Sequence, residues 1–261
     1  MSTVRVAACQ VEVDHDAPFA ERVERVAELV GGQRDCDLVV LPELWASGAF
    51  RFDRFEAEAQ EADGSLVTAM GDAARAAGAW LHAGSFVERA EDGRLFNTSL
   101  LFDDAGRLQA TYRKVHLFGF RDGESTVLDG GGDVVTCPTP FGVVGLSTCY
   151  DQRFPELYRR LVDAGAVLAL VPAAWPERRI AHWQVLTRAR AIEDQLLVVA
   201  VNTVGLQGKV RLGGLTVVVD AWGDVLAEAG PSEAEVLHVD LDPVEVDAVR
   251  ERFPVLGDRR L

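Results

Sequence analysis

Cys149 lies where a buried strand gives way to a helix, which is a favourable position for a nucleophile. Residues 143–147 predict the strand, and residues 156–164 predict a helix that opens after Pro155. A turn of this kind holds a side chain in place beside backbone N–H groups that can bind an anion. The position therefore favours a thiol of lowered pKa next to an oxyanion site. A buried structural cysteine is the alternative interpretation.

Glu43 and Lys114 occupy comparable positions. Glu43 directly follows the apolar residues 38–41 and Pro42, and Lys114 lies in a segment flanked by Tyr and Phe. Alone, each charge could simply be solvated or mark an exposed strand edge. Combined with a thiol, they are the groups that amide hydrolysis through a thioester needs. A carboxylate can take a proton from the thiol and later from water, and a protonated lysine can stabilise the tetrahedral intermediate.

Three segments of the sequence resemble the signatures of the nitrilase superfamily, the carbon–nitrogen hydrolases. They are residues 42–44 (Pro-Glu-Leu), 112–118 (Tyr-Arg-Lys-Val-His-Leu-Phe) and 149–157 (Cys-Tyr-Asp-Gln-Arg-Phe-Pro-Glu-Leu). They occur in the family's order, and the resemblance extends over nearly the whole chain. It implies Glu43 as general base, Lys114 as oxyanion support and Cys149 as nucleophile. The backbone N–H of Tyr150 would complete the oxyanion hole.

The resemblance also implies a second glutamate in the loop after the lysine segment, and Glu124 is the best match. The alternative for Glu124 is a solvated loop charge. Asp151 and Arg153 are expected to form an internal charge pair that fixes the turn after the cysteine. Trp175 follows the predicted strand 167–171, and we expect it to form a wall of the substrate pocket.

Three further segments look like those of omega-amidases, which hydrolyse the terminal amide of short dicarboxylic mono-amides. They are residues 174–176, 182–184 and 253–255. A substrate of this type carries a carboxylate, and arginine binds a carboxylate through its two-pronged guanidinium group. Arg178 and Arg179 are the expected ligands because they lie just beyond Trp175, with Arg211 as a further candidate.

The rest of the sequence predicts an α/β protein in which helices interleave with pairs of strands. Strands are expected at 4–9, 38–41, 80–86, 97–102, 111–116, 134–137, 143–147, 167–171, 196–201, 215–219, 225–227 and 236–239, and helices at 17–30, 66–77, 156–164, 180–192 and 243–252. Apolar strands without alternation are covered on both faces. The layers should therefore be helix, sheet, sheet, helix. The resemblance likewise implies a four-layer α-β-β-α sandwich, with residues 1–261 as one carbon–nitrogen hydrolase domain.

Composition limits the partners of the chain. Its 26 basic and 41 acidic residues give a net charge of −15, which argues against nucleic acid and anionic membrane surfaces. The four scattered cysteines form no zinc motif or disulfide framework, and no nucleotide-binding glycine motif occurs. We therefore expect no cofactor and no metal. Without a signal peptide or a membrane-spanning run, the sequence predicts a cytoplasmic protein that acts on a small-molecule amide. The resemblance implies a homodimer.

Several alternatives remain open at this point. Within the superfamily, the same Glu-Lys-Cys set could serve a deaminated-glutathione-type amidase, a nitrilase or an N-carbamoyl hydrolase. A cysteine–histidine hydrolase would instead use His116 or His182 as its base. A binding module with an incidental thiol is the non-enzymatic alternative.

Overall fold

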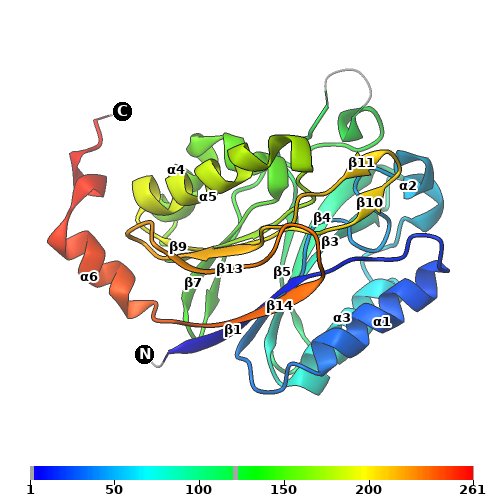
Figure 1. Cartoon of the computed structure of the whole chain (residues 1–261), viewed down its shortest axis with the longest axis horizontal. Coiled ribbons are helices and arrows are strands. Elements are labelled where there is room, and N and C mark those ends of the chain that lie inside the picture. The colour runs from blue at the N-terminus through cyan, green and yellow to red at the C-terminus, as the bar shows by residue number, and fades with distance from the viewer. Residues whose placement is uncertain (1–2, 120–122, 261) are drawn as a thin grey trace.

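Two six-stranded β-sheets form the centre of the computed structural model, which describes residues 3–119 and 123–260 (Figure 1). The first sheet has the spatial order β14 (Glu235–Leu241), β1 (Val4–Gln10), β2 (Leu38–Val40), β3 (Trp80–Arg89), β4 (Leu95–Phe102) and β5 (Leu108–Arg113). The second has the order β13 (Val225–Glu228), β12 (Val217–Val219), β9 (Leu197–Val201), β8 (Leu168–Pro172), β7 (Gly142–Leu146) and β6 (Thr136–Thr139). A two-stranded ribbon, β10 (Leu206–Gln207) and β11 (Val210–Arg211), lies outside both sheets.

Each sheet contains three parallel strands, β1-β2-β3 in the first and β7-β8-β9 in the second, with antiparallel strands on either side. The register aligns Val40 of β2 with His82 of β3, and Leu146 of β7 with Leu170 of β8. In open sheets of this kind, ligand sites form beyond the carboxyl ends of parallel strands. The segments that follow β2 and β8 meet at this edge, where the Glu43 backbone N–H lies 3.4 Å from the Ala173 carbonyl oxygen. The segment after β7 bonds to β8 through the Ser147 N–H and the Leu170 carbonyl.

Helices cover the outer face of each sheet, so the predicted four-layer α-β-β-α sandwich is confirmed. The helices are α1 (Phe19–Gly31), α2 (Phe52–Glu58), α3 (Ser65–Ala77), α4 (Pro155–Asp163), α5 (Ile180–Asp194) and α6 (Val244–Arg252). Figure 1 shows α1 and α3 side by side on the first sheet, and α4 and α5 on the second. Helix α6 extends from the body near the C-terminus. No helix in the described ranges combines the length and apolar character needed to cross a membrane.

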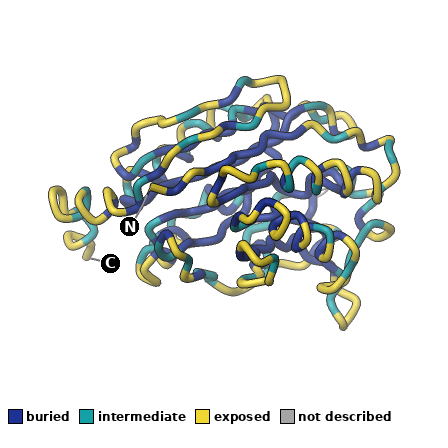
Figure 2. Tube along the Cα trace, turned by 90° about the horizontal axis from the view of Figure 1, so that it is seen from below, coloured by how far each residue is buried: buried dark blue, intermediate teal, exposed yellow. Residues whose placement is uncertain are grey.

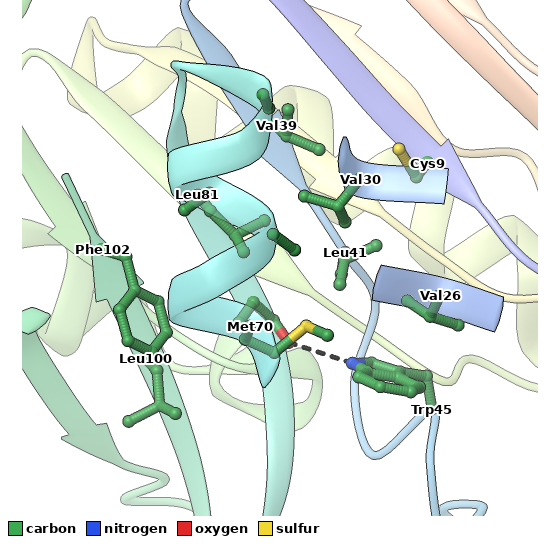
Figure 3. Close-up of a cluster of buried hydrophobic side chains, with 14 of the residues drawn as sticks. Cys9, Val26, Val30, Val39, Leu41, Trp45, Met70, Leu81, Leu100 and Phe102 are labelled. Carbon is green, nitrogen blue, oxygen red and sulfur yellow. Dashed lines mark hydrogen bonds between the residues drawn. The ribbon is translucent and has the colours of Figure 1, made fainter. Parts of the chain in front are cut away.

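The core consists of apolar layers between these elements, visible as the dark interior of Figure 2. Under α1 and α3, Val30, Met70 and Leu81 pack against one another (Figure 3), and the Trp45 indole donates a hydrogen bond to the Ala83 carbonyl at 3.0 Å. A second layer lies between the two sheets, and a third between the second sheet and α4 and α5. Burial of both faces explains why the strands lack polar alternation.

Most predicted elements are present, with ends shifted by a few residues, but two differences matter. The strand expected at 111–116 is β5 and ends at Arg113, so Lys114 lies just beyond it. The backbone at Lys114 still bonds to the Asn97 carbonyl at 2.8 Å. Helix α2 was not predicted from the sequence, because its seven residues bury only Phe55 and are too few to show a clear helical period.

Candidate active site

Cys149 directly follows the segment after β7 and opens a short 3-10 helix, η2 (Cys149–Arg153), which leads into α4. The predicted turn between strand and helix is therefore present. The backbone of Cys149 has φ of +49°, a left-handed conformation that a non-glycine residue adopts only under strain. The Asp151 carboxylate fixes the turn by accepting a hydrogen bond from the Thr148 backbone N–H at 2.9 Å.

Glu43 follows β2 and points at the same place from the first sheet. Its side chain is buried, and each of its oxygens accepts hydrogen bonds. Oε1 accepts from Lys114 Nζ at 2.7 Å and from Asn97 Nδ2 at 2.9 Å, and Oε2 accepts from the Ala174 backbone N–H at 3.0 Å. The Cys149 thiol lies beside this carboxylate. Groups from both sheets therefore meet at one point.

Glu124 completes a buried cluster with Glu43 and Lys114. The Lys114 ammonium donates to one oxygen of Glu124, which also accepts from the Phe118 backbone N–H at 2.7 Å. The other oxygen accepts from Asn97 Nδ2 at 3.3 Å. Only 4% of Glu124 is exposed, so a solvated loop charge is the wrong interpretation.

The charges of this cluster determine its proton-transfer properties. Burial alone would lower the pKa of Lys114, but the carboxylates of Glu124 and Glu43 outweigh it and hold this pKa well above its ordinary value. Burial, together with the charge of Glu43, raises the pKa of Glu124 against the opposing effect of Lys114. The lysine is consequently a permanent cation, suited to stabilising an oxyanion rather than to accepting a proton.

The expected lowering of the Cys149 pKa is wrong. Burial of the thiol, followed by the adjacent Glu43 carboxylate, raises its pKa well above the ordinary value, and Lys114 only partly opposes this. The turn was expected to act through its backbone N–H groups, but a buried carboxylate beside the sulfur has the larger effect. The thiol is therefore protonated at rest and must lose its proton to a base as it reacts.

A cavity of about 400 Å³ opens beside the thiol. The lining residues are Glu43, Ala49, Phe50, Phe52, Lys114, Phe118, Glu124, Cys149, Tyr150, Arg153, Ala174, Trp175, Pro176 and Arg179. The position expected for Trp175 in the pocket wall is thus observed. Within the described residues, no group of three or more His, Cys, Asp and Glu side chains could hold a metal ion.

The predicted ion pair between Asp151 and Arg153 is absent from the described structure. Residues two apart on a 3-10 helix point in different directions, so Asp151 turns inward while Arg153 faces the cavity. The Arg153 guanidinium lies over the rings of Tyr150 and Trp175, at 5.7 and 4.9 Å from their centroids. It also contacts His182 Nδ1 at 3.1 Å. Arg153 is thus a site residue that sequence analysis assigned to another role.

The two arginines predicted to bind substrate differ in position. Arg179 lines the cavity with its guanidinium 4.8 Å from the Phe118 ring centroid, whereas Arg178 is exposed and does not line the cavity. The expectation for Arg178 is therefore wrong, because the short helix of residues 177–179 turns consecutive side chains in different directions. Arg211 is exposed on β11 and is likewise absent from the lining. Burial, followed by the charges of Arg178 and Arg153, lowers the pKa of Arg179.

Comparison with known proteins agrees with this geometry. Residues 5–251 match the carbon–nitrogen hydrolase family. The chain belongs to that family. A 2-oxoglutaramate amidase of Paenarthrobacter nicotinovorans is 45% identical over 98% of this chain and 89% of its own, and a deaminated glutathione amidase of Dictyostelium discoideum is 35% identical over 92% and 87%. A CN-hydrolase superfamily protein of Xanthomonas campestris, solved with an arsenic adduct in its active site, has a TM-score of 0.92 at 30% identity over 100% of this chain and 98% of its own.

In this carbon–nitrogen hydrolase, Asn97 was not predicted as a site residue, although its amide bridges the two buried glutamates. Asn97 lies in β4, every residue of which is buried. A polar side chain in such a strand needs a partner, and this was the available signal. Phe50 and Phe52 were also missed. They lie at the end of the long loop after Glu43 and at the start of α2, and no local sequence pattern predicts that this part of the chain lines the cavity.

Proposed function

We propose that this carbon–nitrogen hydrolase is an omega-amidase that hydrolyses the terminal amide of short dicarboxylic mono-amides such as 2-oxoglutaramate and succinamate. The main support is the pair Arg153 and Arg179, which share a cavity with the Cys149 thiol. Neither forms an ion pair with an acidic residue in the described part of the chain. In a protein of net charge −15, two such cations beside a nucleophile suit a substrate carboxylate. The 2-oxoglutaramate amidase at 45% identity supports the same assignment.

The reaction begins with acylation of the cysteine. As Cys149 Sγ attacks the amide carbon, Glu43 takes the thiol proton, which the raised thiol pKa otherwise keeps in place. The negative charge that forms on the carbonyl oxygen is stabilised by Lys114 Nζ and the Tyr150 backbone N–H. The C–N bond then breaks, Glu43 passes its proton to the leaving nitrogen, and ammonia departs, leaving a thioester.

Hydrolysis of the thioester uses the same groups. Glu43 takes a proton from water, the resulting hydroxide attacks the thioester carbon, and the oxyanion is stabilised as before. The C–S bond breaks, the thiolate regains the proton from Glu43, and the carboxylic acid leaves. Glu124 holds Lys114 in position, and Trp175 confines the acyl chain, while Arg153 and Arg179 bind the distal carboxylate.

Steady-state kinetics with succinamate and the uncharged butyramide test the substrate assignment. Succinamate should have the lower KM, and Arg153→Ala or Arg179→Ala should raise that KM at least about tenfold while changing butyramide kinetics little. Arg178→Ala is the matched control, because it removes the same charge from an exposed neighbouring position. Equal KM values for the two amides in the unmodified enzyme would reject the omega-amidase assignment.

Two measurements test the thioester mechanism itself. Cys149→Ala should abolish turnover, because no group remains to form the acyl intermediate. Mass spectrometry after brief incubation with small amides should find the acyl group on the peptide that contains Cys149. Substantial turnover by Cys149→Ala would refute the assignment of the nucleophile.

A deaminated-glutathione-type amidase is the second candidate, favoured by the Dictyostelium discoideum relative at 35% identity. Its substrate is a longer amide that also carries carboxylates, so the arginines alone do not separate the two activities. The same assay does, because a higher kcat/KM for deaminated glutathione than for succinamate would assign this second activity.

We also propose that residues 1–261 act as one cytoplasmic domain that pairs into a homodimer through α5 and the C-terminal segment. Val185 and Ile192 on α5 are 67% and 50% exposed. Trp222 packs edge-on against Phe253, with 5.8 Å between the ring centroids, and both side chains are about half exposed. Apolar side chains gathered in this way are typical of an interface between subunits. Light scattering after gel filtration should give twice the mass of one chain, and the mass of one chain would contradict the proposal.

A further inference from the structure

Asp151 is a buried carboxylate that joins the two chain segments carrying the lysine and the cysteine of the site. Its side chain is fully buried. Oδ2 accepts hydrogen bonds from the Tyr112 hydroxyl at 2.6 Å and from the Thr148 backbone N–H at 2.9 Å. Oδ1 accepts from the His116 backbone N–H at 2.9 Å and lies 2.7 Å from His116 Nδ1. One carboxylate thus makes four contacts, two at each oxygen.

In the amino-acid sequence, the hydrogen-bond partners of Asp151 lie close to Lys114 and Cys149. Tyr112 and His116 lie two residues before and two residues after Lys114, and Thr148 directly precedes Cys149. The two segments follow strands of different sheets, and the lysine segment extends past the end of β5. Sheet hydrogen bonding therefore does not by itself set the position of the lysine relative to the cysteine.

We propose that Asp151 is a positioning residue, which sets where Lys114 Nζ lies relative to Cys149 Sγ and hence to the oxyanion. The proposal rests on the thioester roles given above but not on the identity of the amide. A displacement of about 1 Å between such groups can cost about a hundredfold in rate. Hydrogen bonds to the backbones of both segments make this carboxylate a direct link between them.

Asparagine cannot replace this carboxylate, because each oxygen of Asp151 accepts a hydrogen bond from a backbone N–H. Whichever way an asparagine amide is oriented, its NH₂ group faces the N–H of either Thr148 or His116. A buried donor opposite another donor is left without a partner, and one of the two segments must move. Loss of the Tyr112 hydroxyl is milder, since both backbone contacts remain.

The test compares Asp151→Asn and Tyr112→Phe with the unmodified enzyme on succinamate and on butyramide. Asp151→Asn should lower kcat about a hundredfold for both amides, and Tyr112→Phe about threefold to tenfold, with each KM changing less than about twofold. Unequal losses for the two amides, or a loss carried by KM, would mean that the substitution disturbs substrate binding, and would overturn the proposal. If the enzyme shows no preference for succinamate, that result counts only against the omega-amidase assignment. The kcat values for butyramide then still test the role of Asp151.

Asp103→Asn is the matched control. Asp103 is 3% exposed and accepts hydrogen bonds from the backbone N–H groups of Ala105 and Arg107, but it lies in the turn between β4 and β5, away from the cavity. This variant should lose thermal stability while keeping kcat within about twofold. A folded Asp151→Asn with the kcat of the unmodified enzyme would overturn the proposal. If Asp151→Asn does not fold, Tyr112→Phe decides alone, and an unchanged kcat for it has the same force.

Discussion

Replacement of Glu43 by glutamine should change two reactivities of Cys149 in opposite directions. The substitution removes the group proposed to take the thiol proton, so turnover of an amide should fall at least about a hundredfold, the usual scale for a general base. It also removes the carboxylate that, after burial, contributes most to raising the thiol pKa, and it leaves the Lys114 cation in place. The thiolate should therefore form at lower pH, and alkylation by iodoacetamide should become faster at neutral pH.

The size of the second effect follows from the charges. A fall of one unit in the thiol pKa gives about ten times more thiolate at neutral pH. Since a glutamine amide must place its NH₂ against either the Ala174 N–H or the Lys114 and Asn97 donors, the cluster is also strained, and stability should fall by about 1–3 kcal/mol. Thermal unfolding should accompany the kinetics to show that the variant is folded.

The assay follows alkylation of the Cys149 peptide by mass spectrometry from pH 6 to pH 10, with the buried Cys9 as internal control. In the unmodified enzyme the rate should still rise at the alkaline end, because the folded thiol has a raised pKa. In Glu43→Gln the rise should move to lower pH. Burial raises the pKa of Cys9 to about 12, so its alkylation should stay slow in both proteins. Alkylation that falls in parallel with amide turnover would refute the electrostatic argument.

Four further substitutions test other parts of the structure. Lys114→Ala should lower kcat at least about a hundredfold, since it removes the oxyanion cation and leaves two carboxylates facing each other; kcat close to normal would exclude that role. Burial raises the pKa of Asp194 to about 7 from the value near 4 of the unfolded chain, so its contribution to stability is lost as pH rises toward 7. Asp194→Asn should accordingly raise the free energy of unfolding in urea by about 2 kcal/mol more at pH 8 than at pH 5. Equal increases at the two pH values would contradict the raised pKa of Asp194. Leu81→Ala should cost about 2–5 kcal/mol by the same method, whereas Leu226→Ala, at a half-exposed position, should cost less than about 1 kcal/mol.

The sequence predicts the layers, and it indicates that Glu43 and Cys149 meet because each comes after an apolar strand. Lys114 was assigned instead through its sequence segment, because β5 before it is mostly exposed and polar. A strand that is buried on both faces is a run of apolar residues without polar alternation, and Pro42 marks the end of the run that forms β2. The assignment of Glu124 from the sequence was less certain than that of the other three residues, because a loop of variable length separates Glu124 from Lys114. Its place against the ammonium depends on tertiary contacts rather than on spacing.

Side-chain direction and electrostatics were harder to predict. An ion pair between Arg153 and Asp151 was expected because the two residues are close in the sequence. In η2 their side chains point in different directions, and the Asp151 carboxylate instead accepts hydrogen bonds from the Tyr112 hydroxyl and the His116 backbone N–H. The thiol pKa was misjudged for a related reason. The turn was visible in the sequence, but the burial of the thiol next to the Glu43 carboxylate was not, and these two effects raise the pKa.

The position of the glycine segment 130–132 suggests a use for the fold in engineering. This partly exposed connection leads from the first sheet to the second, so Glu43, Lys114 and Glu124 precede it and Cys149 follows it. A chain cut there would give two halves, each holding an incomplete catalytic set. Because β14 returns to pair with β1 of the first sheet, the halves would be held together by a full strand on reassembly. Ammonia release would then report the association of the two halves. Because neither half holds a complete catalytic set, the background activity of such a split reporter would be low.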